Sequence, residues 1–136
     1  MTPQQVTLVQ ESFDKVAPVG EAVARDFYHR LFVLDPALKP LFKGDMTEQG
    51  QKLITMLAAV VRNLQYPERI VPTLRELALR HVGYGVRPEH YATVGAALLG
   101  TLQQTLWDDF THDVAEAWQA AYAVLSDVMM KAAYSA

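Results

Sequence analysis

The chain has no cysteine among its 136 residues. This absence excludes disulfide frameworks, zinc–thiolate sites, iron–sulfur clusters and thiol nucleophiles. Long apolar runs are absent too: none reaches 18 residues, which predicts that no segment spans a membrane. The N-terminus, MTPQQVTLVQESF, has no basic stretch followed by an apolar core, so we expect no signal peptide. Together these absences favour a cytoplasmic protein.

Positive charge is also scarce, with 12 Lys and Arg against 15 Asp and Glu, a net charge of −3. Without a basic stripe, nucleic acid is not the expected partner. The sequence contains no HExxH motif, no phosphate-binding glycine loop and no Ser–His–Asp set with supporting local motifs. Hydrophobic residues are plentiful at 51%, while only 20% of residues are charged, so the composition predicts one globular domain with a packed core.

Apolar residues recur with a helical period along nearly the whole chain, and no segment alternates as a strand does. Capping residues, prolines and glycines divide this pattern into about seven helices. The expected helices cover approximately residues 3–17, 21–35, 36–42, 46–64, 72–82, 88–107 and 112 onward. The sequence therefore predicts a single all-α domain over residues 1–136. Periodicity alone does not decide between a helix bundle and a globin-like arrangement.

His81 is the residue with the clearest chemical meaning. It continues the inward stripe of Leu74 and Leu77, so the imidazole should face the core. One interpretation is a core histidine bonded to a backbone carbonyl. The other is an axial ligand of an iron porphyrin, with its second ring nitrogen held by a carbonyl or side chain. Gly83 and Gly85 favour the second interpretation, because they allow a sharp turn beside a flat cofactor.

Two further polar residues, Tyr28 and Gln49, lie on apolar helix faces. A buried tyrosine is often a large hydrophobic residue whose hydroxyl finds a partner, and a glutamine in a first helical turn is often half solvated. Together, however, they could direct two hydrogen-bond donors at one point in an apolar pocket. We expect the other histidines, His29, His90 and His112, at the surface.

Several ordered motifs resemble those of bacterial single-domain globins and of the globin module of flavohaemoglobins. The resemblance extends from about Thr2 to Lys131. It is carried by Phe27-Tyr28-His29-Arg30-Leu31-Phe32, Asp35-Pro36…Leu41-Phe42, Arg80-His81…Gly85-Val86, Pro88-Glu89-His90-Tyr91…Val94-Gly95 and Ala117-Trp118…Ala121-Tyr122. It implies a globin fold in which haem b lies between a distal and a proximal helix.

The resemblance also implies residue roles. His81 is similar to the proximal iron ligand, and Tyr28, Gln49 and Leu53 match a distal trio whose tyrosine and glutamine hydrogen-bond the bound gas. Phe42 matches a phenylalanine that packs on the haem face. The remaining implied haem-contact positions are Lys52, as a partner of a haem propionate, Leu57, Leu77, Val86, Tyr91, Val94 and Leu98.

The chain departs from the flavohaemoglobin pattern in two places. Fifteen residues after Trp118, where those proteins have a glutamate that bonds the proximal histidine, this chain has Ala133. We therefore expect less imidazolate character in His81 and a weaker electron push toward the iron. The sequence also stops at Ala136, with no flavin or nicotinamide module after it. Iron reduction is thus expected to need a separate reductase.

The function that this resemblance implies is reversible, high-affinity binding of dioxygen and other diatomic gases, as in oxygen transport or scavenging at low oxygen. Nitric oxide dioxygenation is a linked activity if a separate reductase supplies electrons. The alternative is a haem-based gas or redox sensor, or an electron-transfer globin, in which His29 or Lys52 could become a sixth iron ligand. We expect a monomer or a weak dimer.

Overall fold

The computed structural model describes residues 1–134, and these contain helices and no strand. The six α-helices are α1 (Pro3–Val16), α2 (Gly20–Leu34), α3 (Met46–Arg62), α4 (Val71–Gly83), α5 (Pro88–Leu106) and α6 (His112–Tyr134). Short 3₁₀ segments join several of them. The predicted all-α class is confirmed.

The six α-helices differ slightly from the predicted count of about seven helices, because the short third helix is of the 3₁₀ type. This 3₁₀ helix covers residues Pro36–Leu41. Asp35 caps it by accepting a hydrogen bond from the backbone N–H of Ala37 at 3.1 Å. Pro40 lies inside the segment and has no N–H to give, so an α-helical hydrogen-bond ladder cannot form there.

Local capping explains where the other helices begin and end. Thr2 and Gln5 form a reciprocal capping box at the start of α1, with hydrogen bonds of 3.0 and 3.1 Å. Asp45 caps α3 through the N–H of Thr47 at 2.8 Å. Between α4 and α5 the chain turns at Gly85, whose φ of 93° suits a residue without a side chain.

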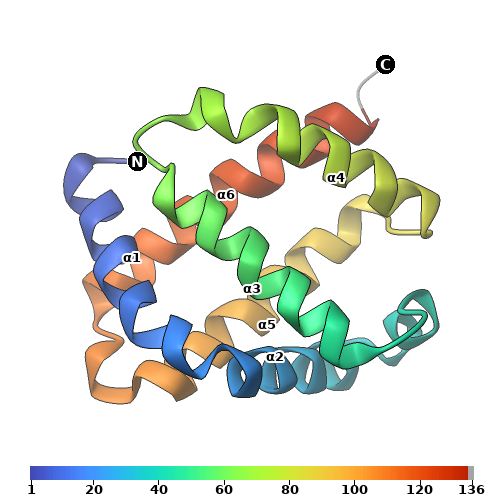
Figure 1. Ribbon diagram of the computed structural model, residues 1–136, viewed down its shortest axis with the longest axis horizontal. Coiled ribbons are helices and arrows are strands. Elements are labelled where there is room, and N and C mark those ends of the chain that lie inside the picture. Colours follow the sequence, from blue (N-terminus) through green and yellow to red (C-terminus); the bar gives the residue numbers. More distant parts are fainter. Residues whose placement is uncertain (135–136) are drawn as a thin grey trace.

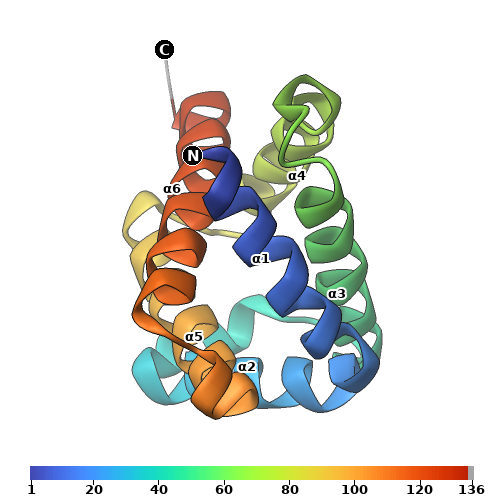
Figure 2. The same cartoon turned by 90° about the vertical axis from the view of Figure 1, so that its left-hand side faces the viewer.

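The helices form two layers with α2 across their base. In Figure 1, α3 crosses the front of the molecule and α4 lies above it, while α5 and α6 run behind. Figure 2 shows the same arrangement from the side, with α3 and α4 on one side, α5 and α6 on the other, and α1 at the end that faces the viewer. α2 packs on both α3 and α5, and α6 packs on both α1 and α4.

Two apolar clusters hold these layers together. The larger joins α1, α2, α3, α5 and α6 around Leu31, Leu102 and Trp118, all less than 4% exposed. The indole N–H of Trp118 donates to the Ser12 hydroxyl at 2.8 Å, which satisfies the buried polar atoms of both side chains. The smaller cluster joins α3, α4, α5 and α6 around Leu74. Residues of both clusters line one cavity between them.

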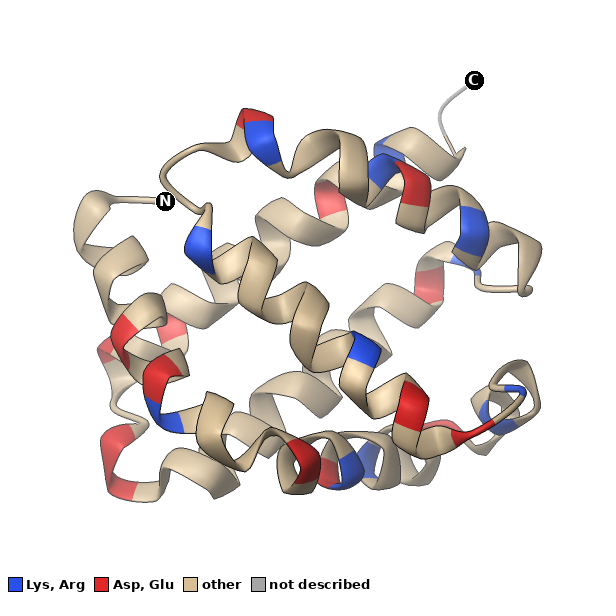
Figure 3. Cartoon of the chain, in the orientation of Figure 1, with Lys and Arg blue, Asp and Glu red and all other residues tan. Residues whose placement is uncertain are grey.

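Charged residues of both signs are spread over the outer faces of the helices (Figure 3). The ion pairs are mostly between residues four apart on one helix, as for Arg25 with Glu21 and Lys131 with Asp127. Within residues 1–134, every helix is too short or too polar to cross a membrane.

Candidate functional site

A largely apolar cavity is enclosed by α2, α3, α4, α5 and α6. Its volume is about 140 Å³, which is smaller than most cofactor and small-molecule sites. Ten of the twelve positions predicted from the sequence line it. They are Tyr28, Phe42, Leu53, Leu57, Leu77, His81, Val86, Tyr91, Val94 and Leu98. Residues far apart in the sequence thus converge on one site.

The other two predicted positions, Gln49 and Lys52, lie outside the cavity wall. Gln49 is half buried at the start of α3, and its backbone oxygen, rather than its side chain, meets Tyr28. Lys52 is exposed and lines a groove on the outer side of α3, between α3 and α4. Both lie within one helical turn of Leu53, which does line the cavity. Their roles toward a bound cofactor or gas stay predictions.

His81, near the C-terminal end of α4, has a defined tautomer. Its Nδ1 lies 2.8 Å from the backbone oxygen of Leu77. A carbonyl oxygen can only accept, so Nδ1 carries the proton and Nε2 keeps a free lone pair. Burial lowers the pKa of His81, and the bond to Leu77 raises it by a smaller amount. The imidazole is therefore neutral near pH 7, which is the form that binds metals.

Tyr28, from the middle of α2, places a protonated phenol at the same cavity. Burial raises its pKa to about 12, so the hydroxyl remains a donor at neutral pH. It donates to the backbone oxygen of Gln49 at 3.3 Å, a long hydrogen bond. The ring packs edge-on against Phe27 and Phe42, with centroid distances of 5.1 and 5.3 Å. The ring is thus fixed, while the hydroxyl is weakly held and can turn to another acceptor.

Three tyrosines gather where α5 and α6 meet near the cavity. Tyr122 donates to the backbone oxygen of Tyr91 at 2.5 Å, and Tyr134 donates to that of Val86 at 2.6 Å. Tyr91 is different: its hydroxyl is the one buried side-chain polar atom within residues 1–134 that has no hydrogen-bond partner. Ala133 stands where the flavohaemoglobin pattern has a glutamate. It packs in the same apolar cluster as Tyr91 and offers no hydrogen-bond acceptor.

One cavity residue, His90, was misplaced by the sequence analysis. It is half buried and lines the cavity, although we expected it at the surface. Its Nδ1 accepts from the backbone N–H of Arg87 at 3.0 Å, which locks the ring over the start of α5. The signal was its place three residues after the helix cap, where side chains fold back. His29 and His112 are exposed, as expected.

Further residues that line the cavity, most of them apolar, were not predicted from the sequence. These are Phe27, Leu31, Leu38, Leu41, Met56, Tyr122, Leu125 and Met129. Apolar periodicity marks such residues as inward-facing but does not separate a cavity wall from the solid core.

The chemistry of the residues that line the cavity fits an iron porphyrin, although its walls must move apart to admit one. The cofactor needs apolar walls for its macrocycle and a neutral imidazole with a free lone pair for its metal. The cavity supplies both, since His81 is held by its other nitrogen. It also supplies the Tyr28 hydroxyl, a donor of the kind that stabilises a negatively polarised ligand.

Comparison with known proteins gives a consistent set of similarities. The sequence profile described as Globin matches residues 25–129. The chain is 33% identical over 133 residues to a flavohemoprotein of Bordetella parapertussis, covering 96% of this chain and 33% of the relative. A flavohemoprotein of Xylella fastidiosa is 32% identical over 131 residues, with 94% and 33% covered. The chain thus spans about a third of the length of these relatives.

Two solved structures are similar over nearly their whole length. A bacterial globin from Campylobacter jejuni has a TM-score of 0.82 and 25% identity, covering 97% of this chain and 96% of that one. An engineered carbene transferase, made from a putative nitric oxide dioxygenase of Rhodothermus marinus, has a TM-score of 0.89 and 26% identity. It covers 98% of this chain and 93% of the other.

Proposed function

Because this chain belongs to the globin family, we propose that it binds haem b in the cavity described above, with His81 as the proximal iron ligand. The observation that carries the proposal is the hydrogen bond from His81 Nδ1 to the Leu77 carbonyl, which leaves Nε2 free for a metal. Haem iron, when bound, supplies an open coordination position for a diatomic gas. The chain's own residues determine how the cofactor and the gas are held.

On this proposal, apolar side chains such as Phe42, Leu53, Leu77 and Val94 pack against the macrocycle and exclude water from the iron. Lys52 is exposed in the neighbouring groove, where its ammonium can pair with a haem propionate. The remaining cavity residues complete the apolar wall. Water exclusion favours reversible gas binding over irreversible oxidation of the iron.

Tyr28 and Gln49 act on the gas. Bound dioxygen has a partial negative charge, so a donor stabilises it and has little effect on neutral carbon monoxide. A hydrogen bond to a charged acceptor contributes about 1.5–3 kcal/mol, which corresponds to roughly 10- to 150-fold slower dissociation. The raised pKa of Tyr28, about 12, supports its role as a permanent donor. High-affinity dioxygen binding, suited to transport or scavenging at low oxygen, is the function that we propose.

A linked activity is nitric oxide dioxygenation, in which nitric oxide, dioxygen and one electron give nitrate. The similarity to a protein described as a putative nitric oxide dioxygenase favours it. The electron comes from a reductase, and the relatives' description as flavohemoproteins suggests a flavin-dependent one. Without a reductase, mixing the dioxygen-saturated ferrous protein with nitric oxide should give a single turnover, with stoichiometric nitrate and ferric protein within the mixing time, because the iron itself supplies the electron. Slow reaction, or loss of dioxygen without nitrate, would exclude this activity.

The experiment that tests haem binding is a haemin titration of wild type, His81→Ala and His90→Ala. Spectra are recorded in the ferric, ferrous and ferrous carbon monoxide states. We expect wild type and His90→Ala to give the spectrum of a histidine-ligated haem and His81→Ala to lose it, because His90 Nδ1 is already occupied by Arg87. The reverse pattern would make His90 the ligand. Absence of stoichiometric haem binding by wild type would refute the proposal.

A further inference from the structure

We propose that small apolar gases reach the cavity by passing Met56, from the groove between α3 and α4. This inference depends on the proposed gas-binding function and adds the route that it uses. On this route, Met56 controls how fast a gas enters and leaves the cavity, and not how tightly the gas binds.

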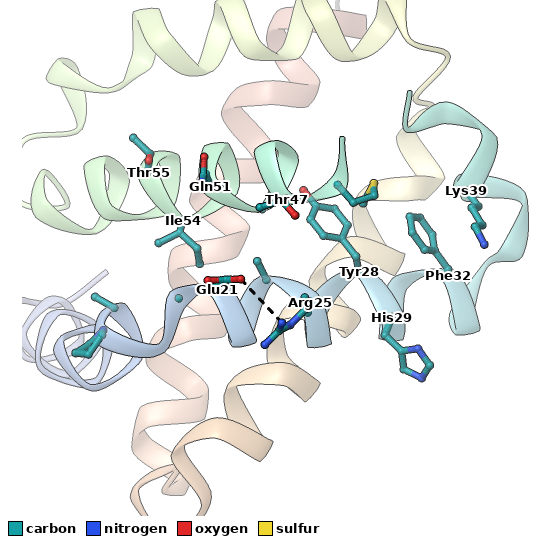
Figure 4. A pocket seen from close by; sticks show the side chains of 16 residues that line it. Glu21, Arg25, Tyr28, His29, Phe32, Lys39, Thr47, Gln51, Ile54 and Thr55 are labelled. Carbon is teal, nitrogen blue, oxygen red and sulfur yellow. Dashed lines mark ion pairs between the residues drawn. The ribbon is translucent and has the colours of Figure 1, made fainter. Parts of the chain in front are cut away.

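Two surface grooves flank α3, and each shares one lining residue with the cavity. The groove between α2 and α3 (Figure 4) shares Tyr28 with the cavity lining. The groove between α3 and α4 shares Met56. Each of these two residues therefore has one side toward solvent and the other toward the cavity, and displacement of either would connect the two.

Tyr28 is a poor candidate for displacement. Its ring is flanked by three phenylalanines with centroid distances of 5.1 to 6.1 Å. The helices beside it are also in tight contact: a Cβ atom on Gly50 would lie 2.9 Å from that of Ala24. α2 and α3 therefore pack directly against each other at this point, with no gap between them for a gas to pass.

The surroundings of Tyr28 are polar as well. Figure 4 shows Glu21 and Arg25, an ion pair at 3.9 Å, on the α2 side of the groove, with Thr47 on the α3 side next to the Tyr28 ring. Such polar groups bind water, and a diatomic gas cannot replace the hydrogen bonds that this water makes. This groove thus offers an apolar gas little affinity on its approach.

Met56 has the opposite properties. It is half buried, its thioether has only a weak capacity to accept a hydrogen bond, and its unbranched side chain has three rotatable bonds. It packs at the edges of both apolar clusters, so it lies at the boundary between them. The path to the surface beyond it runs along a groove lined by Ala59, Val60, Ile70 and Leu74 and also by polar residues, among them Lys52, Asn63 and Arg69. A rotamer change of Met56 opens this path without breaking a hydrogen bond.

Flash photolysis and ligand displacement test the route on the haem-loaded protein. A barrier on the route changes association and dissociation by the same factor, because the gas crosses it in both directions. We expect Met56→Phe to slow both rates by at least about fivefold and Met56→Ala to accelerate both. A changed dissociation constant at unchanged association rate would show that Met56 acts on the bound gas, and would overturn the proposal.

A matched pair of variants distinguishes the two grooves. Ala59→Trp adds a large side chain to the α3–α4 groove, and Thr47→Trp adds the same one to the α2–α3 groove. Ala59→Trp should slow association and dissociation together, whereas Thr47→Trp should leave both within about twofold. Slowing by Thr47→Trp alone would place the route past Tyr28, and no slowing by either would exclude both grooves.

Xenon provides a test on the unmutated protein. With methyl-¹³C methionine, Met46 reports on the α2–α3 groove and Met129 on the cavity, while Met56 reports on both the α3–α4 groove and the cavity. We expect xenon to shift the Met56 and Met129 signals of the carbon monoxide-bound protein and to leave Met46 unchanged. A shift of the Met46 and Met129 signals with no shift of the Met56 signal would contradict the route. Failure to bind haem would appear first in the absorption spectrum, and xenon would still test the route in the protein as purified.

Discussion

At the scale of single residues, the long hydrogen bond of Tyr28 to the Gln49 backbone indicates a donor that can change partner. Tyr28→Phe keeps the ring packing and removes only the hydroxyl. We expect dioxygen dissociation at least about tenfold faster, the low end for loss of a hydrogen bond to a charged acceptor. Carbon monoxide dissociation should change much less. Stopped-flow displacement measures both, and an unchanged dioxygen rate would remove Tyr28 from the distal site.

The unpartnered hydroxyl of Tyr91 gives a second prediction, on stability. A buried donor without an acceptor is unfavourable by about 1–3 kcal/mol, so Tyr91→Phe should leave the free energy of unfolding unchanged or raise it by up to about 2 kcal/mol. Tyr122→Phe is the control, because it removes the 2.5 Å hydrogen bond to the Tyr91 carbonyl and should lower stability by about 1 kcal/mol. Urea denaturation measures both. A marked loss in Tyr91→Phe would reveal an acceptor, such as a buried water.

At the scale of helix packing, the approach of α5 to α6 depends on Gly95. A Cβ atom there would lie 2.7 Å from the Tyr122 ring, closer than packed atoms approach. Gly95→Ala should therefore destabilise the protein by about 1–3 kcal/mol, as overpacked core positions do. Gly83, in the last turn of α4, has nothing within 4 Å of such an atom, so Gly83→Ala should stabilise by about 0.5–1 kcal/mol. Equal effects in thermal unfolding would show that helix propensity, rather than packing, controls both sites.

The helices themselves could be predicted well from the sequence, because their limits depend on local chemistry. Thr2 and Asp45 are side-chain caps, and the hydrogen bonds that they make need only neighbouring residues. The short helix predicted over residues 36–42 is present, but it is a 3₁₀ helix with Pro40 inside it. Local patterns therefore predict helix positions better than helix type in short segments.

The candidate site was predictable where a residue faces inward and has a family counterpart, as for His81 and Tyr28. Its fine geometry was not predictable. The tautomer of His81 depends on the Leu77 carbonyl, and the position of His90 depends on a hydrogen bond to the backbone of Arg87. Such features arise from tertiary contacts, which residue spacing along one chain does not encode.

At the scale of the whole molecule, stability should depend strongly on alkaline pH, because several tyrosines are buried. Burial raises the pKa of Tyr28 and of Tyr91 to about 12, and raises that of Tyr122 as well. An unfolded chain releases these protons near pH 10, whereas the folded protein keeps them. The folded state thus binds more protons between pH 10 and 12, and the free energy of unfolding must fall as pH rises through this range.

Tyr28→Phe isolates the contribution of one of these groups. A shift from 10 to about 12 corresponds to about 2–3 kcal/mol, fully present below pH 10 and lost by pH 12. The variant should therefore lose less stability than wild type between pH 9 and 12, when urea unfolding is followed by circular dichroism at several pH values. Tyr84→Phe is the matched control, since Tyr84 is 61% exposed, and it should follow the wild-type pH dependence. If the Tyr28 variant also follows wild type, Tyr28 titrates normally, and its hydroxyl is in contact with water rather than enclosed beside the cavity.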